Sequence, residues 1–80
     1  MTDGDIMTKK EFIWSIDVST RAKRKLATSL AIELLNYIRN AEEASMERMP
    51  LNLWGTEAYE NAEESVGAVN EAIGQLIEAY

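Results

Sequence analysis

The chain has 80 residues, of which 14 are acidic and 8 are basic, giving a formal net charge of −6. It contains neither cysteine nor histidine, which excludes disulfide bonds, thiolate chemistry, and imidazole as a proton carrier or metal ligand. A chain of this length forms one domain at most and buries a modest fraction of its surface. We therefore expect a single domain that depends on tight packing or self-association.

The composition also bears on location. No apolar run approaches the roughly 20 residues that span a bilayer, and the chain starts with an acidic stretch where a signal peptide is basic. Small secreted domains usually rely on disulfides, which this chain cannot form. These features predict a cytoplasmic protein that does not contact membranes.

The N-terminal part predicts a flexible leader over residues 1–7 and a short helix over 9–16. Thr8 and Glu11 have the spacing of a capping box, in which each side chain accepts a hydrogen bond from an unpaired backbone N–H group. Over residues 11–18, however, apolar and polar residues largely alternate, as in a strand. A strand there needs residues 51–54 or a second chain as its partner, and both alternatives stay open.

A long second helix is predicted over residues 20–48, with Ser19 or Asp17 as its cap and Pro50 beyond its end. Its apolar arc covers about half of the circumference, which is more than one neighbouring helix can cover. Ile32, at the edge of the polar side, is a weaker candidate for an exposed contact. The apolar arc consists of Leu26, Ala27, Leu30, Ala31, Leu34, Leu35, Tyr37, Ile38 and Ala41.

Residues 50–55 form a predicted connector, and a third helix is predicted over 56–80 with Thr56 as its cap. Apolar residues recur along it at alternating intervals of three and four, which predicts a narrow stripe that packs against another helix. The stripe consists of Tyr59, Ala62, Val66, Val69, Ile73, Leu76 and Tyr80.

Together these elements predict an all-α fold. We expect an antiparallel hairpin of two long helices, with the short N-terminal helix completing a three-helix bundle. Because the apolar arcs exceed what one hairpin covers, we also expect a homo-oligomer, first of all a dimer that forms a larger bundle. The residues assigned to the core and to self-association are Leu30, Leu34, Ile38, Tyr59, Val66, Val69, Ile73, Leu76 and Tyr80.

The outer face of the third helix is the main candidate for binding a partner. From Met49 to the end the chain has six glutamates and no lysine or arginine, so this part can attract a basic protein. Gly67 and Gly74 lie one heptad apart on that face, although glycine within a helix costs about 1 kcal/mol relative to alanine. Either a partner backbone approaches closely at the two glycines, or they are neutral substitutions in a helix that is stabilised by packing on its other side. The candidate partner-binding residues are Glu60, Glu64, Gly67, Asn70, Glu71, Gly74 and Glu78.

A basic cluster in the first turn of the second helix is a candidate anion site. It consists of Arg21, Lys23, Arg24 and Lys25. Helix N-termini attract anions, so a phosphorylated small molecule or nucleotide is one interpretation, and solvated side chains balanced by the acidic third helix are the other. The absence of interleaved aromatic residues and the negative net charge argue against direct binding of nucleic acid.

No residue pattern indicates catalysis, a metal site or a cofactor. The carboxylates fall on outer helix faces, and no histidine accompanies them. We therefore expect a non-enzymatic acidic protein that binds a protein partner as an adaptor or inhibitor, with Trp54 and Tyr80 as further exposed contacts. Two other function classes stay open: a self-assembling structural subunit, and a binder of a phosphorylated ligand.

Overall fold

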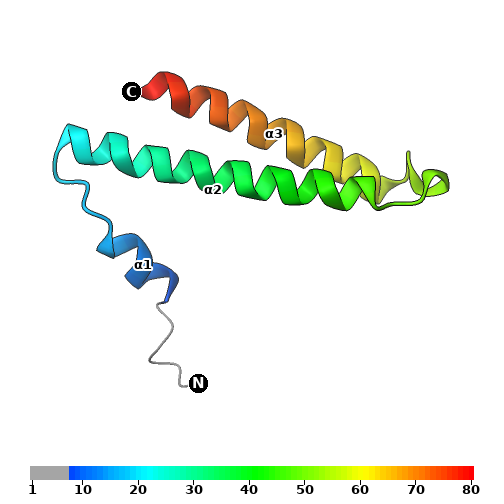
Figure 1. Cartoon of the computed structure of the whole chain (residues 1–80), viewed down its shortest axis with the longest axis horizontal. Helices are drawn as coiled ribbons and strands as arrows, with labels where there is room; N and C mark the ends of the chain where they lie inside the picture. The colour runs from blue at the N-terminus through cyan, green and yellow to red at the C-terminus, as the bar shows by residue number, and fades with distance from the viewer. Residues whose placement is uncertain (1–7) are drawn as a thin grey trace.

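The computed structural model describes residues 8–80, which form three α-helices and one 3₁₀ turn (Figure 1). These residues contain no strand, so the all-α prediction is confirmed and the strand alternative for residues 11–18 is wrong. The predicted leader over residues 1–7 lies outside the described residues. The elements are α1 (Lys9–Ser15), α2 (Arg21–Glu47), η2 (Leu51–Leu53) and α3 (Glu57–Ala79).

Threonine caps the N-terminus of every α-helix. The Thr8 hydroxyl accepts a hydrogen bond from the Glu11 N–H at 3.1 Å, and the Glu11 carboxylate accepts one from the Thr8 N–H at 3.2 Å, completing the predicted capping box. Thr20, one residue beyond the predicted Ser19, caps α2 by accepting from the Lys23 N–H at 3.1 Å. Thr56 caps α3 as predicted.

The connector reverses the chain between α2 and α3. Pro50 follows the end of α2, and Gly55 has a positive φ of 89°, a conformation that favours glycine. Trp54 folds back over this end of the hairpin: its indole N–H donates to the Met49 carbonyl at 3.0 Å, and its ring stacks on Tyr59 with 5.2 Å between ring centroids.

The two long helices run side by side and form the main tertiary contact of the described chain (Figure 1). The heptad stripe of α3 faces α2. Among residues 8–80, Ala62 and Ile73 are the two buried residues, with exposed fractions of 6% and 7%. Tyr59, Val66 and Leu76 are half-buried between the helices.

On α2, the side toward α3 is not the centre of the apolar arc. Half-buried residues recur there at the same intervals of three and four as on α3. Ile32 belongs to this set, so its assignment as an exposed contact is wrong. The half-buried positions with this spacing are Thr28, Ile32, Leu35, Arg39, Glu42, Met46 and Met49.

Helix α1 projects away from the hairpin at the start of α2 (Figure 1). It makes no contact with α2 or α3 comparable to the contact between those two helices. The three-helix bundle and the dimer therefore stay predictions, and one side of α2 lacks a neighbouring helix.

Candidate functional site

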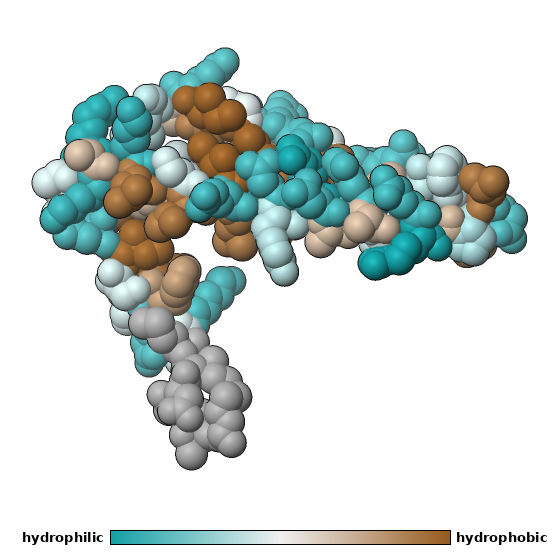
Figure 2. All heavy atoms as spheres, viewed as in Figure 1, coloured by the Kyte–Doolittle hydropathy of each residue, from teal (hydrophilic) through white to brown (hydrophobic). Residues whose placement is uncertain are grey.

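The most prominent surface feature is a row of large apolar side chains on the side of α2 away from α3. Their exposed fractions range from 44% for Ile38 to 75% for Tyr37, although side chains of these types are usually buried. Figure 2 shows hydrophobic residues at the surface where α1 meets the first part of α2. We call this surface the outer face of α2, and it consists of Leu26, Leu30, Leu34, Tyr37 and Ile38.

An apolar groove extends the outer face of α2 toward α1. It is open to solvent, has a volume of about 300 Å³, and has no charged residue in its lining. Phe12 and Ile16 form the α1 side, a role that the sequence did not reveal because the angle between α1 and α2 depends on the linker between them. The α2 side of the groove consists of Ala27, Leu30, Ala31 and Leu34.

Arg39 on α2 forms polar contacts with three residues at the edge of the contact between α2 and α3. Its guanidinium donates to the Asn70 side-chain oxygen at 2.9 Å and to the Asn40 side-chain oxygen at 3.3 Å, and it lies 3.8 Å from the Glu43 carboxylate. Asn70, one of the predicted partner-binding residues, is exposed, and its side-chain oxygen accepts this hydrogen bond from α2. A polar residue at the edge of a helix contact can point either way, and spacing alone does not tell which.

The remaining residues of the predicted partner surface lie exposed along the outer side of α3. Glu64, Glu71 and Glu78 form no ion pair within the described chain. A Cβ placed on Gly67 or Gly74 would meet no atom within 4 Å. Packing within the chain therefore does not require glycine at either position. Glu60 lies exposed on the same side of α3.

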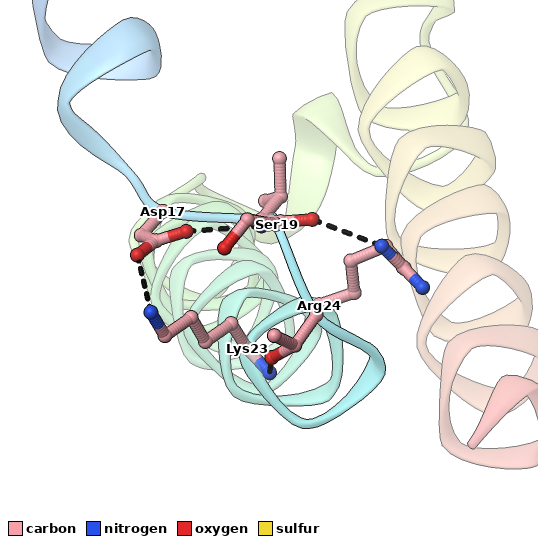
Figure 3. A network of polar contacts seen from close by, with 6 residues as sticks. Asp17, Ser19, Lys23 and Arg24 are labelled. Atoms are coloured by element: carbon pink, nitrogen blue, oxygen red, sulfur yellow. Dashed lines mark hydrogen bonds and ion pairs between the residues drawn. The ribbon is translucent and has the colours of Figure 1, made fainter.

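The basic cluster at the start of α2 does not converge on a single site (Figure 3). The Lys23 ammonium lies 2.6 Å from the Asp17 carboxylate, whereas the Arg24 guanidinium donates to the Val18 carbonyl at 3.0 Å. The Arg21 guanidinium lies over the Tyr80 ring, 4.9 Å from its centroid. These contacts tie the α1–α2 linker and the C-terminus to the start of α2, and Lys25 lies exposed beside them.

Asp17 is an exposed carboxylate whose environment favours its charged form. The hydrogen bond from Lys23, and then the one from the Ser19 backbone N–H at 2.9 Å, lower the pKa of Asp17 below its ordinary value. This pair connects the linker between α1 and α2 to the first turn of α2.

Both predicted aromatic contacts lie at the ends of the hairpin. Trp54 is 47% exposed at the connector, and Tyr80 is 39% exposed at the opposite end. Both have partners within the chain, since Trp54 stacks on Tyr59 and Tyr80 lies under Arg21. They close the two ends of the contact between α2 and α3 while leaving part of each ring in solvent.

Within residues 8–80, no three acidic side chains gather closely enough to hold a metal ion together. None of the helices there is long and apolar enough to cross a membrane. The chain matches no protein-family model, no curated protein and no solved structure.

Proposed function

We propose that this chain is a non-enzymatic protein-binding protein whose main protein-contact surface is the outer face of α2. The observation that carries the proposal is the exposure of five large apolar side chains along one side of a single helix. Contiguous apolar surface of this kind marks protein interaction sites. Its position on a long helix suits a partner that is itself helical.

The distribution of polar groups supports the same proposal. Arg21, Lys23 and Arg24 contact groups of the chain itself, and the acidic residues of α3 spread along an exposed helix side. A surface with dispersed charge around an apolar strip resembles the core and rim of a protein interface.

A site-specific photocrosslink tests the proposal. Tyr37, 75% exposed on the outer face of α2, is replaced by the photoreactive benzoylphenylalanine in cells of the natural host. Gln75 on the exposed part of α3 serves as the control position. We expect irradiation to attach a polypeptide at position 37 and none at position 75. An unmodified chain at both positions would overturn the proposed function.

A second candidate surface is the acidic side of α3, which suits a basic protein partner. The open space above Gly67 and Gly74 favours it, because a partner backbone can approach there without displacing any atom of this chain. In this role as an adaptor or inhibitor the wild-type chain should capture a basic protein from extracts of the natural host, Glu71→Lys should weaken that capture, and Glu33→Lys on α2 should not. Equal binding by both variants would show that the acidic side of α3 contacts solvent and does not bind a basic partner.

A further inference from the structure

We propose that the outer face of α2 packs antiparallel against the same face of a second copy of this chain, so that the two α2 helices form the centre of a dimer. This inference rests on the proposed function, since it names the partner of the same surface.

The first argument is a second heptad pattern on α2. It starts on the outer face and extends to the end of the helix, again at intervals of three and four. In an antiparallel pair these positions meet about a two-fold axis near residues 35–36, so that Leu34 meets the partner's Tyr37, Leu30 meets the partner's Ala41, and Ala27 meets the partner's Ala44. Large residues thus meet near the axis and small ones toward the ends, which is the self-complementarity that a two-fold contact requires. The positions are Ala27, Leu30, Leu34, Tyr37, Ala41 and Ala44.

The second argument is charge. The first five residues of α2, Arg21–Lys25, carry four basic side chains, whereas the last six, Glu42–Glu47, carry three acidic ones. Antiparallel packing in this register brings Arg24 opposite the partner's Glu47, directs the basic start of each helix toward the more acidic end of the other, and opposes the two helix dipoles. Parallel packing would instead place like charges together at both ends, so the charge pattern selects the antiparallel arrangement.

The third argument is area. At the exposed fractions observed, the five side chains of the outer face of α2 present on the order of 600 Å² per chain, which is close to the roughly 800 Å² that each partner buries in a stable interface. The groove beside α1 adds to this area, because Phe12 in its lining is 57% exposed. The antiparallel arrangement brings the alanine-rich end of the partner's α2 to this groove, where small side chains allow close approach.

Disulfide trapping tests both the partner and its direction. The chain has no cysteine of its own, so Ala27→Cys and Ala44→Cys each introduce the only thiol. Each variant is oxidised alone and in an equimolar mixture, with a tag that makes the two chains differ in mass. An Ala68→Cys variant, placed at an exposed position of α3, is mixed with Ala44→Cys as the matched control.

We expect the mixture of Ala27→Cys and Ala44→Cys to give a crosslinked dimer with one chain of each kind, at least tenfold more than either variant alone or the control mixture. Crosslinks within each single variant would show parallel packing and overturn the inference. An absence of crosslinks would also overturn it, and would point to α1 folding onto α2 or to a different protein on this surface. The photocrosslink at position 37 separates these failures, because a different attached protein leaves the proposed function standing and refutes only the second copy.

Discussion

Replacement of Leu34 by alanine should weaken the dimer far more than it weakens the folded chain. Leu34 is 57% exposed in the single chain, so less than half of its possible burial contributes to folding. Complete burial of a leucine side chain is worth about 1.5–3 kcal/mol, so covering the exposed part contributes about 1–2 kcal/mol per chain. A two-fold interface contains the residue twice, and the loss of both should raise the dissociation constant roughly 30- to 700-fold.

Sedimentation equilibrium over a series of concentrations measures this constant directly. Ile77→Ala is the matched control, because Ile77 is a similarly exposed aliphatic residue, at 62%, but lies on α3. We expect Ile77→Ala to leave the dissociation constant within about twofold of the original, a difference below 0.5 kcal/mol. If Leu34→Ala and Ile77→Ala change the constant equally, the association does not run through the outer face of α2.

Other changes give distinct signatures. Gly67→Ala and Gly74→Ala should each stabilise the folded chain by about 1 kcal/mol, because a Cβ meets no atom at either position, whereas Gly55→Ala should destabilise it by about 1 kcal/mol because its φ is 89°. Thermal unfolding followed by circular dichroism should show the melting temperature raised by about 4–8 °C in the first two variants and lowered by a similar amount in the third. Melting temperatures that change in the same direction in all three variants would contradict the helix geometry. The pair of Asp17 with Lys23 lowers the pKa of Asp17, so its contribution to stability is present above the ordinary value of 3.8 and is lost as the pH falls through the lowered pKa. Asp17→Asn should accordingly lower the melting temperature slightly at neutral pH and leave it unchanged in strong acid, and a difference that persists in strong acid would exclude ionisation as its cause. Because opposite charges meet at the ends of the paired α2 helices, added salt should raise the dissociation constant of the dimer, and a constant independent of salt would contradict the antiparallel charge pairing.

The sequence predicted the helices well because their signals are local. The predicted helix at 20–48 compares with the observed Arg21–Glu47, and the predicted helix at 56–80 compares with Glu57–Ala79. Threonine caps, Pro50 and the heptad stripe of α3 act within a few residues of the feature they determine. The alternation over 11–18 left a strand open as an alternative to the predicted helix, and the capping box outweighed it in a chain with no pairing strand among residues 8–80.

The side of α2 that contacts α3 could not be predicted in the same way. An apolar arc that covers half of a helix does not say which of its edges the neighbouring helix takes. The observed contact uses an edge that includes Ile32 and Arg39, and Arg39 donates a hydrogen bond to Asn70 on α3. The consequence is the exposed outer face of α2, on which the proposed function rests.

The most direct test of the account is the molar mass of the unmodified chain in solution. The chain has a mass of 9.0 kDa, so pairing through α2 predicts an average mass that rises toward twice that value as the chain concentration is raised to about 1 mM, where even weak dimers with a binding free energy of roughly −4 kcal/mol begin to form. A mass of 9.0 kDa that holds over this whole range would show that α2 does not pair with a second copy.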